Sequence, residues 1–435
     1  MNSNQTWLPL AIGCVLALVF LYLALRANRK KRLVDNIPTS KTTGVFVGLV
    51  ELKGTAETDA PLTSYLSEQS CVYYSWDVQE HWSRTVTETY TDSQGKTQTR
   101  TRYESGWTTV ANGGEMTPFY LKDDYGVVLV RPEGAKIEPQ TIFRKSCSRG
   151  DPLYYAKGPA HSVPNSDHRR LFTEHAILLH APLYVVGHAR ERADIVAPEI
   201  AADKDAELFL ISTRSESQVS KRMRWASLGW HFLGLVVSAG TAQFAFGNGA
   251  DAGVGPVIGA GLYLLTATVG WVWMAYNSMV DLKNRVSQGW SQVDVQLQRR
   301  HDLIRALVAV VKGLRDYERE VQTELAALCS QLEATPPGQP GPDPSAVGTV
   351  LKALAEKYPE LKTMESFLKL QKELIDTETR IALARGYFND IATHYNNRLE
   401  MIPDRYVSRL AGLKPQALMA ANNFERLPVA VRFET

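Results

Sequence analysis

The chain has 435 residues, of which 44% are hydrophobic, and its 48 basic and 46 acidic side chains leave a formal net charge of +2 at pH 7. This length is enough for two or three domains with separate cores. The balanced charge argues against nucleic acid as a partner, because such binding needs a strongly basic surface. The four cysteines, Cys14, Cys71, Cys147 and Cys329, are far apart, which excludes a CxxC zinc or redox motif and predicts free thiols.

The first element is an apolar run of about 19 residues, Trp7 to Leu25, which is long enough to cross the hydrocarbon core of a membrane. No Lys or Arg precedes this run, and the basic stretch "RANRKKR" follows it. A cleavable signal peptide carries its positive charge in front. The sequence therefore predicts a retained membrane anchor over residues 1–25, with the N-terminus outside, and a basic juxtamembrane linker over residues 26–43.

Residues 44–214 are rich in Thr, Val and Tyr, and short alternating runs are separated by turn residues. "VTETYT", "DSQGK" and "TQTRTRYES" predict a polar hairpin, and "HAILLHAPLYVVGHA" predicts an apolar strand pair that is broken at Pro182. The composition favours a mainly-β or α+β domain. Cys71 precedes "VYY", and this apolar context predicts a buried, inert thiol rather than a nucleophile.

Five of the nine histidines cluster within 28 positions of this region, and imidazole is a common metal ligand. They are His161, His168, His175, His180 and His188. No HExxH or HxH spacing occurs among them. We therefore expect strand and loop histidines, no metal site, no cofactor and no catalytic residue in this domain.

Two further apolar runs, residues 225–246 and 256–275, predict a second and a third membrane span. The connection "GNGADAGVGP" carries no Lys or Arg, whereas "SKRMR" precedes the second run and "DLKNR" follows the third. The positive-inside rule places the residues between the first and second spans, and those after the third, in the cytoplasm. His231 is then a neutral side chain near the cytoplasmic interface, although an intramembrane histidine can also handle ions or protons.

Small residues in the second and third runs predict that the two helices pack closely as a hairpin. The expected packing positions are Gly234, Ser238, Gly255 and Gly259.

Residues 276–435 have helical periodicity on both sides of the proline- and glycine-rich stretch "ATPPGQPGPDPS", which includes residues 334–344. The first helix continues from the third span, and the return helix ends near Glu400. Two long amphipathic helices separated by a breaker predict an all-α, coiled-coil-like antiparallel hairpin or bundle.

Ionisable side chains fall on the apolar faces of both long helices, where an unpaired charge is costly. The predicted buried polar network comprises Asp294, Arg300, His301, Glu378, Arg385 and Tyr395. Paired charges at these positions would fix the pairing register of the two helices. The alternative is a metal-dependent hydrolase, but its two Glu-x-x-His pairs are missing, because Gln298 precedes His301 and Ile391 precedes His394.

Two families resemble parts of the chain. "TSYLSEQSCVYYSWDVQEHW", "FYLKDDYGVVLVRPEGAKI" and "LYVVGHA" resemble the GIDE domain of mitochondrial outer-membrane ubiquitin ligases and bacterial relatives. In those ligases a separate RING domain carries out the chemistry, and its zinc needs closely spaced cysteine pairs that this chain lacks. The resemblance therefore implies a membrane-adjacent β domain without ubiquitin transfer.

The C-terminal residues resemble the LemA family. The matching stretches are "YNSMVDLKNRV", "WSQVDVQLQRRHDLIRALVAVVKGL", "YPELK", "LQKELIDTETRIALARGYFNDIATHYNNRLE" and "ERLPVAVRF". The long insertion after the first span and the proline-rich interruption depart from the family pattern. The family includes proteins linked to bacterial membrane remodelling and magnetosome formation, so the resemblance implies a scaffold by analogy.

Together these features predict a multi-pass protein of the bacterial inner membrane. It would have three transmembrane helices, a GIDE-like cytoplasmic domain (44–214) and a LemA-like helical domain (276–435). The expected partners are the lipid bilayer, other copies of the chain and cytoplasmic proteins. The expected function is a non-enzymatic scaffold in membrane organisation, remodelling or envelope stress. The alternatives are a metal-dependent hydrolase, an enzyme of a ligase pathway, and a ring-forming conduit or adaptor.

Overall fold

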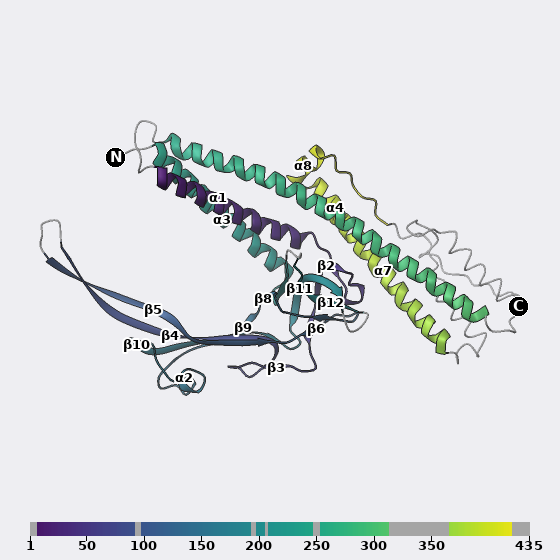
Figure 1. Ribbon diagram of the computed structural model, residues 1–435, viewed down its shortest axis with the longest axis horizontal. Coiled ribbons are helices and arrows are strands. Elements are labelled where there is room, and N and C mark those ends of the chain that lie inside the picture. The colour runs from purple at the N-terminus through teal and green to yellow at the C-terminus, as the bar shows by residue number, and fades with distance from the viewer. Residues whose placement is uncertain are drawn as a thin grey trace. The chain divides into compact units, whose positions relative to one another are not determined.

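The computed structural model describes residues 7–91, 97–192, 197–204, 208–246, 253–312 and 365–419 (Figure 1). It divides into two compact units, Lys41–Glu216 and the combination of Met1–Ser40 with Ser217–Thr435. The predicted proline-rich loop at 334–344 and the last LemA-like stretch, "ERLPVAVRF", lie outside the described residues.

The unit Lys41–Glu216 contains two sheets, and its main core lies on the first. The order in this sheet is β2-β6-β7-β12-β11-β13-β8. Its strands are β2 (Gly48–Glu57), β6 (Phe119–Lys122), β7 (Val127–Val130), β8 (Lys136–Glu138), β11 (Pro182–Glu191), β12 (Pro198–Ala201) and β13 (Leu210–Ser212), and the short β1 (Thr39–Ser40) and η2 (Thr42–Gly44) precede them. The apolar run in β11 becomes the centre of the sheet, and Leu52, Leu121, Val185, Ile200 and Ile211 form a fully buried cluster beside it.

The second sheet has the order β3-β4-β10-β9, and β5 pairs with β4. Its elements are β3 (Leu62–Thr63), β4 (Ser70–Thr91), β5 (Thr97–Met116), β9 (Gln140–Ser148) and β10 (Ser166–Leu178), with the short helix α2 (Leu153–Ala156) after β9. The predicted hairpin is confirmed, and β4 and β5 stay paired from Tyr73 and Met116 to Thr91 and Thr97. Figure 1 shows these two strands running past the ends of β9 and β10. The alternating polar residues explain why the outer half of the hairpin is exposed on both faces.

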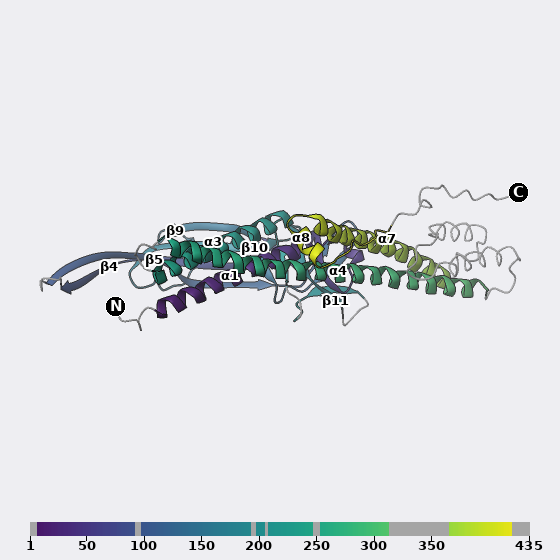
Figure 2. The same ribbon diagram turned by 90° about the horizontal axis from the view of Figure 1, so that it is seen from above.

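The other unit is helical and comprises α1 (Trp7–Asp35), α3 (Glu216–Phe246), α4 (Val254–Lys312), α7 (Glu365–Glu400) and α8 (Asp404–Leu410) (Figures 1 and 2). The expectation that the third apolar run and the following helix form one rod is confirmed, because α4 is continuous over 59 residues. At 1.5 Å per residue this helix is about 90 Å long.

The N-terminal part of this unit is a three-helix arrangement. The hydroxyl of Ser227 in α3 donates a hydrogen bond of 3.0 Å to the carbonyl of Ala24 in α1, and a Cβ on Gly13 would meet the side chain of Thr241. Ser238 of α3 bonds the Gly259 carbonyl of α4 at 2.8 Å. Helix α3 therefore runs antiparallel to both neighbours, and α1 and α4 run parallel to each other.

The prediction of three membrane spans is supported in part. Among the described helices, two are long and apolar enough to cross a membrane, within Leu8–Asp35 and Val254–Ala306. The run at 225–246 does form a helix, α3, and this helix is long enough to cross a membrane. The mean hydropathy of its apolar part is lower than that of the other two helices. The physical reason is its content of glycine, serine and tryptophan together with His231 and Gln243, which lower its mean hydropathy.

The long helices α4 and α7 form the predicted antiparallel hairpin. The rings of Trp290 and Phe388 meet edge to face with centroids 5.4 Å apart. Farther along, Arg300 and Glu378 form an ion pair of 3.5 Å. Buried apolar side chains fill the contact between these two points, because both helices carry hydrophobic residues at spacings of three and four.

Candidate functional site

The end of α1 is joined to α7 and α8 by buried and half-buried polar side chains, which we call the junction cluster (Arg32, Asp35, Asn36, Arg398 and Asp404). The guanidinium of Arg32 donates two hydrogen bonds to the carboxylate of Asp404, at 2.9 and 2.8 Å. Arg32 is 7% exposed and Asp404 is 2% exposed. The two residues are 372 positions apart, so the pair joins the first helix of this unit to its last described helix, α8.

Arg398 of α7 is the second cation of the junction cluster. It donates a hydrogen bond of 2.9 Å to the side-chain oxygen of Asn36 and forms ion pairs with Asp404 at 3.5 Å and Asp35 at 3.9 Å. Burial lowers the pKa of the Arg398 guanidinium, and the positive charge of Arg32 lowers it further. Two carboxylates therefore balance two guanidinium groups, which makes the burial of these charges tolerable.

Helices α3 and α4 also contribute to this cluster. Ser220 of α3 donates a hydrogen bond of 2.7 Å to Asp35, and the amide of Asn36 donates one of 3.1 Å to Ser278 of α4. The Arg32 guanidinium lies 5.7 Å from the ring centroid of Trp271 in α4. The junction cluster thus contacts five helices, α1, α3, α4, α7 and α8.

Little in the sequence indicated this cluster. Arg32 lies in the basic run after the first apolar stretch, where side chains are usually solvated. Asp404 follows Pro403 at the start of a short helix, a position that also suits a solvated carboxylate. Only the packing of α8 against the end of α1 brings them together.

The six residues of the predicted polar network are not all placed together. Arg300, 7% exposed, pairs with Glu378 across the hairpin, while Arg385 and His301 are half-buried. The Asp294 oxygen Oδ1 is buried and has no hydrogen-bond partner within the described part of the chain. The network as a whole stays a prediction.

Tyr395, the sixth residue of that network, has a different environment. It is fully buried, and its hydroxyl donates a hydrogen bond of 3.1 Å to the carbonyl of Lys414, in the segment that follows α8. Burial raises the pKa of this phenol. Tyr395 therefore holds the chain after α8 against α7, at a distance from the Arg300–Glu378 pair.

The four predicted packing positions lie where α3 and α4 touch. A Cβ on Gly234 would overlap the Tyr263 hydroxyl, one on Gly255 would come within 2.9 Å of the Ala242 carbonyl, and one on Gly259 within 2.5 Å of the Ser238 carbonyl. Glycine at these positions allows the two backbones to approach closely. His231 faces the same contact, and its ring nitrogen lies 3.3 Å from the Tyr263 hydroxyl.

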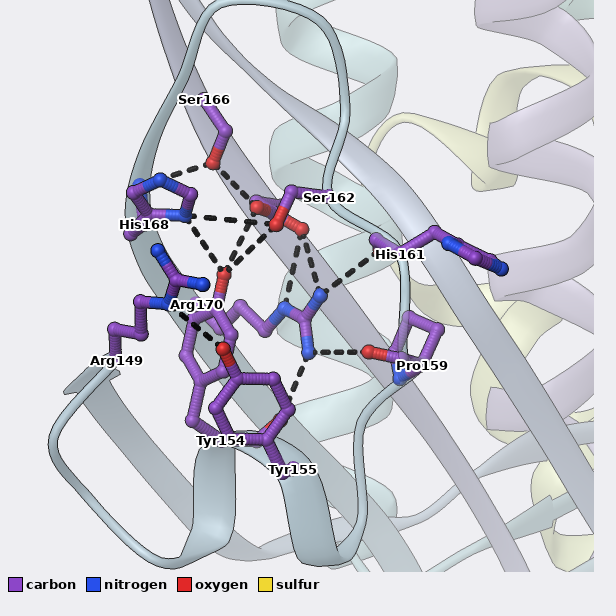
Figure 3. Close-up of polar contacts among 10 residues, drawn as sticks. Arg149, Tyr154, Tyr155, Pro159, His161, Ser162, Ser166, His168 and Arg170 are labelled. Carbon is purple, nitrogen blue, oxygen red and sulfur yellow. Dashed lines mark hydrogen bonds and ion pairs between the residues drawn. The ribbon is translucent and has the colours of Figure 1, made fainter.

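A second buried polar cluster lies in the unit Lys41–Glu216, around Arg170 of β10 (Figure 3). Its guanidinium donates two hydrogen bonds to Glu80 of β4, at 3.1 and 3.0 Å, and both side chains are fully buried. The remaining donors bond the carbonyls of Tyr154, Pro159 and His161 at 2.8, 2.8 and 3.1 Å. The guanidinium also lies 3.9 Å from the ring centroid of Tyr154.

The carboxylate of Glu80 is saturated by donors. Burial alone would raise its pKa, but hydrogen bonds from Ser166, Arg170 and Tyr154 together lower it. This cluster pins the loop after α2 to the sheet, because the loop carbonyls of Pro159 and His161 point at Arg170 (Figure 3). Its saturated hydrogen bonds suit a structural role.

The histidines and cysteines of this unit were also singled out from the sequence. The described residues contain no group of three or more His, Cys, Asp and Glu side chains that could hold a metal ion. His168 lies at the edge of the Arg170 cluster, 3.5 Å from the Tyr154 hydroxyl, and His175 lies 3.0 Å from the Thr141 hydroxyl. Cys71 is fully buried as predicted, and burial, followed by the negative charges of nearby glutamates, raises the pKa of its thiol to about 11.

Comparison with known proteins adds to this geometry. The LemA family model matches residues 289–433, and the GIDE model, described as E3 ubiquitin ligase, matches residues 87–244. The magnetosome protein MamQ of Magnetospirillum gryphiswaldense is 23% identical over 197 residues, covering 37% of this chain and 72% of that protein. Protein LemA of Metamycoplasma hominis is 22% identical over 171 residues, covering 37% and 78%. Residues 289–433 of this chain therefore form a LemA-like region.

A further relative is MamQ 2 of Paramagnetospirillum magneticum, which is 22% identical over 182 residues, covering 34% of this chain and 66% of that protein. The LemA match includes the end of α4 together with α7 and α8, and thus Arg398 and Asp404. Arg32 lies outside both matched regions. The junction cluster therefore ties the LemA region to the N-terminal apolar helix.

The GIDE match begins inside β4 and ends inside α3, whereas the sequence placed this domain at 44–214. Its N-terminal limit therefore excludes β2, which pairs with β11 from Gly48 to Thr55. The fold of this region needs both segments, because β2 and β11 are neighbours in the first sheet.

Proposed function

We propose that this LemA-family membrane protein is a non-enzymatic scaffold, in which the junction cluster fixes a rigid cytoplasmic arm to a membrane-embedded helix bundle. The supporting observation is the Arg32–Asp404 pair, which joins the end of an apolar helix to the LemA region. From Ala275, where the apolar part of α4 ends, the helix continues to Lys312, about 55 Å farther. A flexible joint between α1 and α8 would suit catalysis or gating. The buried pair with two hydrogen bonds that is found there suits an arm in a fixed position.

In this proposal α3 crosses the membrane together with α1 and α4, for a reason independent of its hydropathy. Because α1 and α4 run parallel, the chain must return across the same thickness between them. Helix α3 lies antiparallel to both, and the rings of Phe20 and Trp230 stack with centroids 5.8 Å apart. Its outward side chains Leu228, Phe232 and Val236 are apolar and share one helix face at spacings of four.

The proposed orientation follows the distribution of charge. Basic residues follow the apolar part of α1 and surround the start of α3, and the connection between α3 and α4 contains none. The positive-inside rule then places the N-terminus outside and both the GIDE region and the α4–α7 hairpin in the cytoplasm.

We propose that the arm binds a second copy of the chain through the exposed face of α7. Leu368 is 46% exposed and Ile375 is 55% exposed, and the exposed Ala382 follows after another seven residues. Apolar residues that repeat every seven positions on an exposed helix face are typical of coiled-coil contacts. On α4, the positions seven residues before and after the exposed Val295 are the polar Gln288 and Asp302, so that helix has no matching stripe.

The test is the mass of the full-length protein in detergent, measured by light scattering, for the wild type, Ile375→Glu and Val295→Glu. Both substitutions replace an exposed apolar side chain, so neither should unfold the hairpin. We expect several subunits for the wild type and Val295→Glu, and a smaller assembly for Ile375→Glu. A monomeric wild type, or an equal effect of both variants, would contradict the proposal. Stoichiometric zinc or iron in the same sample would instead favour the hydrolase.

A further inference from the structure

The turn from α7 into α8 exposes apolar and basic side chains side by side. Its apolar residues Met401, Ile402, Tyr406 and Leu410 are 54%, 68%, 61% and 89% exposed. The cations Arg405, Arg409 and Lys414 are exposed beside them. We call these seven residues the corner surface. Tyr406 and Leu410 share a helix face at a spacing of four, and the buried Asp404, Val407 and Ser408 occupy the opposite face.

The junction cluster fixes the level of the corner surface along the apolar helices. Asp404, the first residue of α8, is bound to Arg32, whose guanidinium lies over Trp271. A Cβ on Gly270 would come within 2.7 Å of Leu25, so the apolar runs of α1 and α4 end at the same level. Helix α8 therefore begins where these runs end, and Figure 1 shows it beside α4 near the end of α1.

Aromatic side chains mark this level as the boundary between hydrocarbon and headgroups. Trp225 at the start of the α3 apolar run and Trp273 near the end of the α4 run are both 72% exposed. Tryptophan is enriched at this boundary because its ring is apolar and its N–H is polar. The same depth suits an amphipathic segment that lies in the plane of the membrane surface.

The corner surface is held rigidly from both sides. Before it, the Arg32–Asp404 pair fixes the start of α8. After it, the Asn396 side chain exchanges two hydrogen bonds with the backbone of Gln416, at 2.8 and 2.9 Å, and Asn389 does the same with Met419, at 3.0 and 2.8 Å. The exposed side chains are thus presented in a fixed orientation instead of folding back onto α7.

We propose that the corner surface is a foot that inserts Ile402, Tyr406 and Leu410 between the headgroups of the bilayer that α1 and α4 cross. Arg405, Arg409 and Lys414 bind the phosphates of anionic lipids at its rim. The foot limits the tilt of the α4–α7 arm, because it contacts the membrane to one side of the helix bundle. A second copy fits this surface less well, since two basic rims would repel each other.

This proposal rests on the membrane crossing described above, and one experiment separates the two. Spin labels are attached at Leu410→Cys, Leu262→Cys or Asp376→Cys in the full-length chain with its native cysteines replaced, in nanodiscs of phosphatidylcholine and phosphatidylglycerol. Leu262 is 60% exposed in the apolar part of α4. Asp376 is exposed on the distant part of α7, away from the stripe proposed for self-association. Relaxation by oxygen reports lipid, and relaxation by a water-soluble nickel chelate reports water.

We expect labels at 410 and 262 to favour oxygen and the label at 376 to favour nickel. If 262 favours oxygen while 410 behaves like 376, the foot is refuted and the crossing stands. If 262 favours nickel, the crossing itself fails. A label at 410 that is immobilised and shielded from both agents indicates a protein contact, which also overturns the proposal.

A second measurement leaves the native cysteines in place. Leu410→Trp and Ile375→Trp each add one fluorophore, and lipids brominated near the headgroup should quench the added emission only at 410. The basic rim is tested with Arg405→Gln/Arg409→Gln in the spin-labelled chain. The oxygen preference at 410 should increase from neutral to anionic discs with the native arginines and stay constant in the double variant. If the double variant shows the same increase from neutral to anionic discs as the chain with the native arginines, phosphate binding by the rim is refuted.

Discussion

Replacing Arg170 with methionine should selectively destabilise the unit Lys41–Glu216. The guanidinium makes two hydrogen bonds to Glu80 and three to backbone carbonyls, and methionine can replace none of them. At about 1 kcal/mol of net stability per bond, the loss is about 5 kcal/mol. Removal of one partner from a buried ion pair typically costs about 3–5 kcal/mol, so the two values agree.

The assay is hydrogen exchange, followed by mass spectrometry, on peptides from β10 in the full-length protein. A loss of about 3–5 kcal/mol raises the exchange rate of the most protected amides by roughly 10²–10³·⁵. Arg131→Met is the matched control. Arg131 is 42% exposed and bonds Glu199 at 2.7 Å, but Arg190 also bonds that carboxylate, at 2.9 Å. The control should cost less than about 1 kcal/mol.

The pH dependence of stability should also differ between this variant and the wild type. In the wild type the lowered pKa of Glu80 contributes stability that is present above the unfolded value, about 4.5, and is lost as pH falls through the folded pKa. Without Arg170 the folded pKa of Glu80 rises, because its burial remains while the hydrogen bond and the charge that lower the pKa are lost. Arg170→Met should therefore lose less stability than the wild type as the solution is acidified. Equal exchange rates in both arginine variants, or the same pH trend in variant and wild type, would refute the reasoning.

The other predictions concern the helical unit and the thiols. Asp404→Asn removes one of the negative charges that balance Arg32 and its neighbours, so thermal unfolding in detergent should show that the free energy of unfolding falls by about 3 kcal/mol. The matched substitution of an exposed carboxylate, Asp376→Asn, should have little effect. Similar unfolding midpoints for the two variants would contradict the role of the junction cluster. The pKa of about 11 keeps the Cys71 thiol protonated at pH 8, so mass spectrometry should show slow alkylation until the protein is denatured. Equally fast labelling before and after denaturation would count against its burial. Gly259→Leu should lower the unfolding midpoint in detergent because its Cβ would meet the Ser238 carbonyl, and Gly261→Leu, with nothing within 4 Å, should not; equal midpoints would argue against close packing there.

Local patterns in the sequence determined most elements of this protein. Apolar periodicity gave the long helices and their antiparallel pairing, since side chains three and four positions apart share a helix face. Alternation of Thr with polar residues gave the β4–β5 hairpin, and the apolar run after Pro182 predicted the strand that is now β11. These signals depend only on neighbours along the chain, so they can be read without the fold.

The same reasoning was less successful for membrane spans, where the mean hydropathy of a segment decides whether it can cross a membrane. The run at 225–246 was predicted as a span from its length, yet His231, Gln243 and several glycines bring its hydropathy below that of α1 and α4. What distinguishes α3 is its antiparallel packing between two parallel helices. That relation is a property of the bundle and is absent from the segment itself.

Only the tertiary structure brought the charged sites together. Arg32 and Asp404 are 372 positions apart, and Glu80 and Arg170 are 90 apart on neighbouring strands. Each of these four residues, taken alone in the sequence, suits a solvated surface, because charged side chains are almost never fully buried unless they are paired. The partner is what makes the burial tolerable, and a partner at such a distance is selected by strand register and helix packing, which a single sequence does not encode locally.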